Sequence, residues 1–425
     1  MKAVRYRKFA VEICRIILGA TFIFSGLVKA IDPVGGALKI EDYLAAFSLS
    51  YFNPLSTLIA INLFAIEFML GLCILLAVYR KFISTCMLFF MSFMTLLTLC
   101  LAIFNPVHDC GCFGDAIILT NWETFFKNAF VLFPASIVTF IYRKLMTPAY
   151  TFKAYWFVVL FGYLFPVGFG FYNYINLPII DFRPFKIGVN IPEQMAFPED
   201  APHDEYLYIY EKDGKKTSFT PATSPAGDST WTFVKAKLIK EGYVPPILSF
   251  ELSNAEGVDL TDRILSNDNG VFLLIAHNID KASDKHTDEI NNLYDYAVEH
   301  HIPFYGVTNS SKDEINAWIN NTGAEYPFLF ADDVTLKTII RSNPGLVLLK
   351  AGTILKKWSH NYLPSEENTD TEIQGLLNAT DTDAGKEKSP LLWIICCFAL
   401  PLLLVWIYDY LRNRRKKHKE DNKTA

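Results

Sequence analysis

Long apolar stretches dominate the pattern of this chain, and short polar segments separate most of them. Each stretch is long enough to supply the roughly 20 helical residues that cross a hydrocarbon core of about 30 Å. The first stretch contains Glu12 and Arg15 and further apolar stretches follow it, so we expect a retained helix rather than a cleaved signal peptide. The pattern predicts six transmembrane helices, at Val11–Val28, Leu55–Tyr79, Phe82–Phe104, Glu123–Tyr142, Phe152–Leu177 and Leu391–Leu411.

The segment between the fifth and sixth apolar stretches has a different, mostly polar pattern. Residues Tyr206–Tyr210 alternate and lead through the turn Lys212–Lys215 into Thr217–Thr220, which predicts a β-hairpin. From about Pro245, short apolar runs alternate with helical spacing, which predicts a layered α/β domain. Its expected strands are Gly270–Ala276, Ile302–Val307, Tyr326–Phe330, Leu346–Lys350 and Ile354–Trp358, and its expected helices are Asp284–His300, Ser311–Asn320 and Asp333–Arg341.

Composition agrees with a membrane protein. A hydrophobic fraction of 51% and a mean hydropathy of +0.22 are too apolar for an ordinary soluble protein of 425 residues. The formal net charge of −5 is small, and Lys and Arg lie mostly at the ends of apolar stretches. The charge balance therefore gives no reason to propose nucleic acid as a partner, whereas membrane lipid is an expected one.

The distribution of basic residues predicts the orientation of the chain, because cytoplasmic loops retain Lys and Arg. With the N-terminus inside, the short outer loops hold only Lys29 and Lys39. The basic residues on the inner side are then Lys2, Arg5, Arg7, Lys8, Arg80, Lys81, Arg143, Lys144, Lys153 and those of the tail Arg412–Lys419. We expect an inner-membrane protein whose segment from about Pro178 to Ser389 is extracytoplasmic and whose tail binds the inner face.

Two of the eight cysteines lie in a polar loop, His108–Asp115, with the sequence HDCGCFGD. The other six lie in apolar stretches, where a cysteine is usually a small hydrophobic residue. Gly111 allows the sulfurs of Cys110 and Cys112 to meet. The small ring closed by their disulfide would be strained and easily reduced, which indicates a pair that takes part in thiol–disulfide exchange. Two alternatives remain open: a soft-metal site formed by His108, Cys110, Cys112 and Asp115, or a permanent disulfide that tightens the loop.

The soluble segment contains no thiol, since no cysteine occurs between Phe113 and Ile395. The order of elements over residues 245–365 resembles the thioredoxin fold of membrane-anchored thiol reductases. Where that fold carries Cys-x-x-Cys, this chain has His277–Lys281, and Pro344 falls where the fold keeps its cis-proline. The resemblance therefore implies a binding or docking module around Pro344 rather than a dithiol catalyst.

The sequence Cys110–Gly114, after a third apolar stretch, resembles the signature of the MauE branch of the DoxX-like membrane proteins. The first helix of that family carries an Arg, small residues and a Lys, and the second carries an acid. The matching residues here are Arg15, Gly19, Ser25, Gly26, Lys29 and Glu67. The resemblance covers about Arg5 to Arg143 and implies a role in disulfide formation or maturation of periplasmic proteins, beside a thioredoxin-like partner.

Glu67 lies near the middle of the second apolar stretch, where an ionised group costs at least about 2.5 kcal/mol unless it is paired. Arg15 and Lys127 are candidate partners, although Glu12 and Arg15 have the spacing to pair with each other. Glu67 and Arg15 are therefore candidates for proton transfer, and a structural ion pair is the alternative. Candidates for a second relay sulfur are Cys100, Cys396 and Cys397.

These observations predict a membrane α-helical bundle fused to an extracytoplasmic α/β thioredoxin-like domain. We expect Cys110 and Cys112 to be the catalytic pair, a membrane quinone to be the electron acceptor, and an exported thiol or disulfide protein to be the partner. A non-enzymatic assembly or docking factor with a structural loop disulfide is the alternative. The expected divisions are 1–150 (four-helix bundle), 151–178 (fifth helix), 179–244 (β-rich linker), 245–365 (thioredoxin-like domain), 366–390 (linker), 391–411 (anchor) and 412–425 (cytoplasmic tail).

Overall fold

The computed structural model describes the chain except residues 1, 108, 241, 366, 379–389 and 425, and the side chains of residues 391 and 416–424. Six helical segments within the described chain are long and apolar enough to cross a membrane, which confirms the predicted multi-pass arrangement. They are α1 (Lys2–Ile31); α3 (Ser56–Leu75) after the turn Ser50–Leu55; α4 (Arg80–Phe104); α5 (Asn121–Lys127), continued by the π-turn Asn128–Leu132 and α6 (Phe133–Ile141); α7 (Tyr155–Ile175) after the turn Phe152–Ala154; and α14 (Leu391–Thr424).

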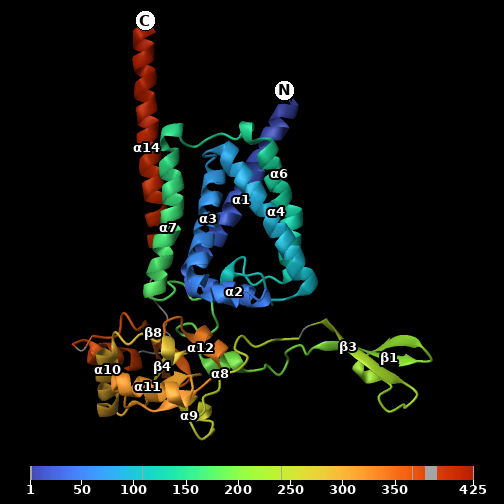
Figure 1. Ribbon diagram of the computed structural model, residues 1–425, viewed down its shortest axis with the longest axis vertical. Coiled ribbons are helices and arrows are strands. Elements are labelled where there is room, and N and C mark those ends of the chain that lie inside the picture. Colours follow the sequence, from blue (N-terminus) through green and yellow to red (C-terminus); the bar gives the residue numbers. More distant parts are fainter. Residues whose placement is uncertain (1, 108, 241, 366, 379–389, 425) are drawn as a thin grey trace.

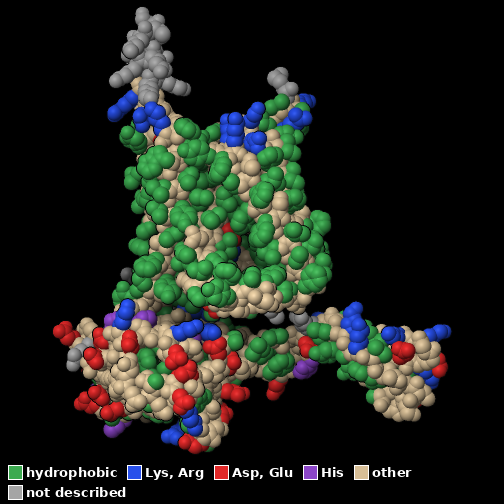
Figure 2. Space-filling view, in the orientation of Figure 1, with side chains coloured by type: hydrophobic (Ala, Val, Ile, Leu, Met, Phe, Trp, Pro, Cys, Tyr) green, Lys and Arg blue, Asp and Glu red, His purple; other side chains and the backbone are tan. Residues whose placement is uncertain are grey.

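The helical bundle has two distinct ends. Both termini of the chain lie at one end, and both β-sheets lie at the other (Figure 1). Basic side chains gather at the end with the termini, and hydrophobic side chains cover the middle (Figure 2). The loop between α4 and α5, which carries Cys110 and Cys112, is at the sheet end (Figure 1). The loop and the sheets therefore lie at the same end of the helical bundle.

Helices α1 and α3 pack closely because glycines lie where they cross. A Cβ atom on Gly26 would lie 2.7 Å from the carbonyl oxygen of Phe64, and one on Gly71 would lie 2.7 Å from the backbone nitrogen of Ile23. Neither distance leaves room for a methyl group, and small residues allow helix backbones in membranes to approach in this way. The approach lets polar side chains of the two helices meet inside the bundle.

Helix α2 (Pro33–Ala46) lies across the sheet end of the bundle and was not expected from the apolar pattern (Figure 1). The Asp32 side chain caps this helix by accepting the backbone N–H of Gly35 at 2.8 Å, and Pro33 occupies the first helical position. Both features are typical of helix starts. The helix places Lys39 and Tyr43 beside the loop that carries the cysteine pair.

A five-stranded mixed sheet forms the centre of the larger soluble region. Strands β4, β5 and β6 are parallel to one another, and β7 is antiparallel to both of its neighbours. The strands are β4 (Val271–Ala276), β5 (Phe304–Thr308), β6 (Phe328–Phe330), β7 (Gly345–Lys350) and β8 (Thr353–Ser359), in the order β6-β5-β4-β7-β8. Each corresponds to a predicted strand, so the α/β prediction is confirmed.

Helices cover both faces of this sheet, because alternate residues of each buried strand point to opposite faces. One core contains Phe272 and Leu274, and the other contains Val271 and Leu273. The first is covered by α10 (Thr287–Glu299), α11 (Lys312–Thr322) and α13 (Thr369–Asn378), and the second by α8 (Ile191–Met195), α9 (Thr261–Leu265) and α12 (Asp333–Ile339). Helix α13 lies within the segment expected to be a linker, and it packs on the sheet through Ile373.

A second, three-stranded sheet stands apart from the rest of the molecule (Figure 1). It consists of β1 (Glu205–Lys212), β2 (Lys215–Phe219) and β3 (Thr232–Lys240), in the order β2-β1-β3. Strands β1 and β2 are the predicted hairpin, paired from Tyr208 with Phe219 to Lys212 with Lys215. Strand β3 was not expected, and every one of its residues is exposed.

Candidate functional site

The loop between α4 and α5 brings the two predicted catalytic sulfurs together. The Sγ atoms of Cys110 and Cys112 lie 2.9 Å apart, and both residues are free thiols. Gly111 adopts a φ of +63°, a left-handed conformation that glycine adopts without strain. The Asp109 carboxylate accepts the backbone N–H of Gly111 at 3.0 Å and holds the turn. Gly111 thus lies at the turn that brings the two sulfurs close together.

Helix α2 fixes this loop from the side. The Nζ atom of Lys39 lies 2.5 Å from an oxygen of Asp109, and the Tyr43 hydroxyl donates to the carbonyl oxygen of Cys110 at 2.8 Å. At the far end of the loop, Thr120 and Glu123 form a capping box that starts α5. The loop therefore has a defined position between α2 and the start of α5.

A buried ion pair lies beneath the loop. The Nζ atom of Lys29 is 2.8 Å from both carboxylate oxygens of Glu67, whose exposed fraction is 4%. The hydroxyl of Ser25 is 2.9 Å from the Glu67 carboxylate and 2.6 Å from the carbonyl oxygen of Cys112. A hydroxyl has one proton, so Ser25 donates to one of these oxygens at a time. These groups form a continuous polar path from the middle of α3 to the sulfur pair.

The partner of Glu67 is Lys29, and not Arg15 or Lys127 as expected from sequence. The Arg15 guanidinium lies 2.6 Å from Glu12, which confirms the alternative pairing, and it donates to the carbonyl oxygen of Thr147 at 2.9 Å. Because Thr147 lies between α6 and α7, Arg15 is held at the end of the bundle away from the sulfurs.

Lys127 lies near the sulfur pair but bonds differently. Its Nζ atom is 4.0 Å from the centre of the Phe113 ring, a cation–π distance, and Phe113 directly follows Cys112. The lysine therefore adds positive charge beside the loop without pairing with Glu67.

The other candidate sulfurs are not brought to the pair. Cys100 of α4 is absent from the cluster of described side chains that packs around Cys110, in which its neighbour Leu101 takes part. Cys396 and Cys397 are on α14, which packs on α7 through Phe398. A relay sulfur at any of these three positions remains a prediction.

The surroundings of the pair make the two thiols chemically unequal. The hydrogen bond from Cys112 is the largest influence that lowers the pKa of Cys110 to about 7, and Tyr43 and the cations Lys29 and Lys127 act in the same direction against burial. The same hydrogen bond and burial raise the pKa of Cys112 well above its ordinary value. When the reduced pair loses a proton, Cys110 therefore becomes the thiolate first, and Cys112 keeps its proton.

This asymmetry predicts a pH profile for alkylation of the reduced protein. We expect the reaction of Cys110 with iodoacetamide to rise with pH through a midpoint near 7, because only the thiolate reacts. Cys112 should react slowly over the same range. Mass spectrometry of the peptide after labelling at different pH values measures both rates. A midpoint for Cys110 near the usual value of about 8.5 contradicts the assignment.

A cavity of about 590 Å³ opens beside the sulfur pair. Its polar lining includes Cys110, Cys112, Lys29 and Tyr43, and its apolar walls come from α2, α3 and α4, including Phe47, Leu63, Phe93 and Leu97. Figure 2 shows a hollow in the hydrophobic face of the bundle with an acidic side chain inside it. The cavity therefore has the character of a site for an apolar molecule with a few polar atoms.

The soluble domain reaches the loop through Arg341. The guanidinium lies 2.8 Å from Asp32, at the start of α2, and 3.2 Å from Asp115, three residues after Cys112. Burial opposes the charged form of Arg341, but the two carboxylates outweigh it and raise its pKa. Arg341 thus joins the soluble domain, α2 and the cysteine loop in one network.

Arg341 lies three residues before Pro344, the predicted docking residue. The bond between Asn343 and Pro344 is cis, and the Asn343 side chain donates to the carbonyl oxygen of Asn278 at 2.7 Å. Asn278 belongs to the stretch that replaces Cys-x-x-Cys. The structure therefore places Pro344 beside that stretch, where the central strand β4 ends and its neighbour β7 begins.

Among the described residues, no group of three or more His, Cys, Asp or Glu side chains has the arrangement of a metal site. His108, which belongs to the metal alternative, lies outside the described residues.

Several contributors to the site were not identified as such from the sequence. Tyr43, Lys39 and Asp109 depend on the position of α2, and Arg341 lies 309 residues from Asp32. Lys29 and Ser25 carried a signal, because both matched the family pattern of the first helix. Their contacts with Glu67 and Cys112 required the packing of α1 on α3.

Two family models match separate parts of the chain. Residues 7–141 match the family model of methylamine utilisation protein MauE, and residues 204–241, which cover the three-stranded sheet, match a domain of unknown function (DUF8463). Neither a curated protein nor a solved structure matches the chain. The MauE match extends from α1 to α6 and includes Cys110, Cys112, Lys29 and Glu67. The N-terminal membrane part of this protein is therefore a MauE-like helical bundle.

Proposed function

We propose that this protein exchanges disulfides with exported proteins through Cys110 and Cys112, at the outer face of the inner membrane. The observation that carries the proposal is the pair of free sulfurs 2.9 Å apart, held in a fixed loop beside a buried cation. A structural loop needs neither unequal thiols nor a cavity that reaches both sulfurs. The MauE-like bundle supports the same class of function.

The uneven distribution of basic residues supports the outer location of the site. Arg80 donates to the carbonyl oxygen of Met146 at the connection from α6 to α7, which is at the bundle end with the termini, and Arg143 begins that connection. Lys2, Arg5 and Lys8 also follow the pattern of a cytoplasmic face. Loop and soluble domain are at the opposite end, where oxidising surroundings let a disulfide persist.

The mechanism follows from the unequal thiols and begins with the pair oxidised. A thiolate of the client attacks Sγ of Cys112, which is less buried than Cys110. A bond forms between client and Cys112, the bond between Cys110 and Cys112 breaks, and Cys110 leaves as a thiolate. A thiol with a low pKa is the better leaving group. The second client thiol then attacks the mixed disulfide, which gives an oxidised client and a reduced pair carrying the two electrons.

Side chains around the pair stabilise this leaving group. The charges of Lys29 and Lys127 favour the Cys110 thiolate, and the hydrogen bond from Tyr43 to the Cys110 carbonyl fixes its backbone. Ser25 and Glu67 form the adjoining polar path along which a proton can be held. Glu67 then acts as a positioning residue for Lys29, and proton transfer by Glu67 is part of the same proposal.

Regeneration of the pair requires a two-electron, two-proton acceptor, which a lipophilic quinone would supply when bound. The cavity fits such a molecule, because Phe47, Leu63 and Phe93 offer an apolar wall while Tyr43 and both sulfurs lie in its lining. Tyr43 and Lys29 are the residues placed to hold a polar ring oxygen, and the apolar walls exclude water from the sulfurs.

The soluble domain supplies docking rather than thiol chemistry in this proposal. The β4–α10–β5 unit, the β7–β8 hairpin and the final helix α13 follow the connectivity of the thioredoxin fold, and the cis bond before Pro344 supports the resemblance. That fold presents clients beside its cis-proline. Here Arg341, three residues before Pro344, contacts Asp115 of the cysteine loop, so a client held at Pro344 would be near the pair.

Trapping of the client tests the mechanism. In the Cys110→Ser variant the Cys112 thiolate can still attack the disulfide of an oxidised client, which is the reverse of the last exchange step. One client sulfur leaves as a thiolate, and no Cys110 thiolate is present to complete the reverse reaction, so we expect client adducts on Cys112 to accumulate. In Cys112→Ser the remaining thiol is buried, and we expect at least several-fold fewer adducts. Non-reducing gels of intact cells after acid quenching measure both. Cys86→Ser, at another free cysteine of α4, is the matched control and is expected to resemble the wild type.

A non-enzymatic adaptor is the second candidate, and the absence of cysteine from the soluble domain favours it. In that case the pair is fully oxidised in cells, neither single variant traps a client, and the Cys110→Ser/Cys112→Ser double variant still supports export of the client. This combination of results would contradict the exchange proposal.

A further inference from the structure

The three-stranded sheet has two chemically different faces, because side chains alternate along each strand. Aromatic side chains gather on one of them. The ring of Tyr210, which is 7% exposed, lies 5.4 Å from that of Phe233 and 6.0 Å from that of Phe219. The Phe219 ring in turn lies 5.1 Å from that of Trp231. This aromatic face therefore supplies the packing that holds the three strands together.

The opposite face of the sheet carries lysines. Leu207 of β1 pairs with Lys237 of β3, and Ile209 pairs with Lys235, so these four side chains point to the same side. The same register adds one lysine of β2 and one at the end of β3. We call this side the lysine face, and its exposed lysines are Lys216, Lys235, Lys237 and Lys240.

Two of these lysines have carboxylates nearby. Lys216 and Lys240 lie 3.9 Å and 3.5 Å from glutamates of β1, and all of these groups are exposed to solvent, where such pairs contribute little. Lys235 and Lys237 form neither an ion pair nor a hydrogen bond with any residue that the structure describes. Their ammonium groups are therefore open to a partner outside the chain.

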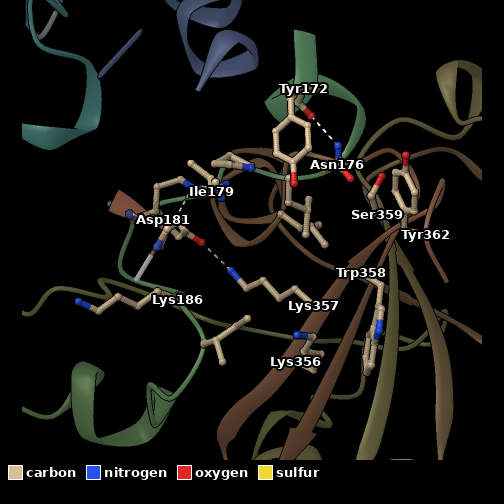
Figure 3. A pocket seen from close by; sticks show the side chains of 16 residues that line it. Tyr172, Asn176, Ile179, Asp181, Lys186, Lys356, Lys357, Trp358, Ser359 and Tyr362 are labelled. Carbon is tan, nitrogen blue, oxygen red and sulfur yellow. Dashed lines mark hydrogen bonds and ion pairs between the residues drawn. The ribbon is translucent and has the colours of Figure 1, made fainter. Parts of the chain in front are cut away.

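Lysines in the neighbouring regions stabilise the fold instead. Lys357 of β8 points to the carboxylate of Asp181, 3.0 Å away (Figure 3). Lys39 of α2 pairs with a carboxylate of the cysteine loop. Lys235 and Lys237 differ from these lysines because they lie on an exposed strand and contact solvent alone within the described chain.

The position of the sheet brings the lysine face close to the membrane boundary. The sheet extends past the side of the bundle, near the level of α2, which lies across the end of the bundle (Figure 1). Most of the basic side chains visible on the sheet in Figure 2 are on the side toward that level. A bilayer around the bundle would therefore end beside these side chains.

The base of the sheet is fixed where its two connecting segments meet. The backbone N–H of Tyr243 donates to the carbonyl oxygen of Pro202 at 2.7 Å, and the Asp204 carboxylate accepts the N–H of Gly242 at 2.8 Å. These bonds join the segment that enters the sheet to the segment that leaves it. The sheet therefore extends as one unit from the rest of the soluble region.

We propose that the lysine face binds the membrane surface at the sheet end of the bundle, through the headgroups of anionic phospholipids. Negative headgroups attract lysines that lie within a few ångströms of them. Leu207 and Ile209 add apolar surface between the lysines, which suits the boundary between headgroups and water. Addition of a further strand to the edge of β3 is disfavoured, because lysines on an edge strand oppose such pairing.

Chemical labelling of lysines in the full-length protein tests the proposal. The purified chain is placed in nanodiscs of phosphatidylcholine, with or without phosphatidylglycerol, and treated briefly with an acetylating N-hydroxysuccinimide ester. Mass spectrometry then gives the extent of labelling at each lysine. Lys215 is the control within the same sample, because it is exposed but pairs with Lys212 and so points to the aromatic face.

We expect phosphatidylglycerol to lower the labelling of Lys235 and Lys237 at least about fivefold and to leave Lys215 unchanged. Salt at about 1 M, where the Debye length is about 3 Å, should restore the labelling. Equal labelling of Lys235 and Lys237 with and without phosphatidylglycerol overturns the proposal. Protection that instead requires an added acidic protein assigns the face to a protein partner and also overturns it.

Hydrogen exchange of the β3 amides provides the second measurement. Phosphatidylglycerol should slow this exchange in the wild type and in Lys215→Gln, but not in Lys235→Gln/Lys237→Gln. Exchange of the β1 amides, at the centre of the sheet, shows whether each variant still folds. Equal slowing in the wild type and the double variant contradicts the assignment. None of these results depends on the thiol pair, so they are separate from the test of disulfide exchange.

Discussion

Replacing Lys29 with Met is expected to destabilise the membrane bundle by about 3–5 kcal/mol and to slow disulfide exchange. The substitution leaves the Glu67 carboxylate, 4% exposed, without the cation that lies 2.8 Å from both of its oxygens. It also removes one of the charges that lower the pKa of Cys110. Unfolding of the purified protein in detergent measures the first effect, and alkylation of Cys110 as a function of pH measures the second.

The double variant Lys29→Met/Glu67→Leu separates these two effects. Removing both charges leaves no unpaired group, so most of the stability should return, to within about 1–2 kcal/mol of the wild type. The alkylation midpoint of Cys110 should nevertheless remain above the wild-type value, since Lys29 is still absent. A double variant whose Cys110 titrates like the wild type would show that Lys29 acts on the fold alone. A stable single variant would contradict the buried pair itself.

The membrane helices and the main sheet could be predicted from the sequence because each depends on a local pattern. A single apolar run such as Phe82–Phe104 spans a membrane as a helix, because a helix satisfies all its backbone hydrogen bonds within the one segment. The strand Val271–Ala276 is buried on both faces, so its residues form one continuous apolar run. The capping box of Ser311 and Glu314 gave the start of α11 to the residue.

Elements that depend on contacts distant in sequence were harder to predict. Helix α2 is neither long enough to span a membrane nor strongly amphipathic, and it is held at the end of the bundle by contacts with α3 and with the loop. Strand β3 has no buried face, so the pattern of its side chains in the sequence did not indicate a strand. It is a strand because it forms hydrogen bonds with β1. Both elements exist because of their neighbours.

The same distinction applies to the site. Cys110, Gly111 and Cys112 are adjacent in sequence, and their geometry is set within one turn, so the close sulfurs could be predicted. The partner of Glu67 could not be predicted. The sequence shows how deep a charged residue lies in its own helix, but it does not show which other helix faces that residue. Lys29 is the partner because glycines allow α1 to approach α3 at that level.

Replacing Arg341 with Met is expected to weaken the docking of the soluble domain on the bundle roughly 100-fold, which corresponds to about 3 kcal/mol. The Arg341 side chain is 10% exposed and lies between two carboxylates of the membrane part, so its loss leaves Asp32 buried beside an apolar group. Limited proteolysis at residues 178–190, between α7 and the sheet, should become faster. Arg263→Met, at an exposed arginine of α9, is the matched control and should have no effect.

The two carboxylates that hold Arg341 should contribute unequally to docking. Asp32 is 13% exposed and lies 2.8 Å from the guanidinium, whereas Asp115 is 42% exposed and lies 3.2 Å from it, where water screens the interaction. Asp32→Asn is therefore expected to increase proteolysis more than Asp115→Asn. Asp115→Asn should instead act mainly on the loop, and alkylation of Cys112 should become several-fold faster because the residue three positions away is released. If Arg341→Met changes neither proteolysis nor alkylation, the soluble domain is held by its chain connections to α7 and α14 instead, and a client bound at Pro344 is not fixed beside the sulfur pair.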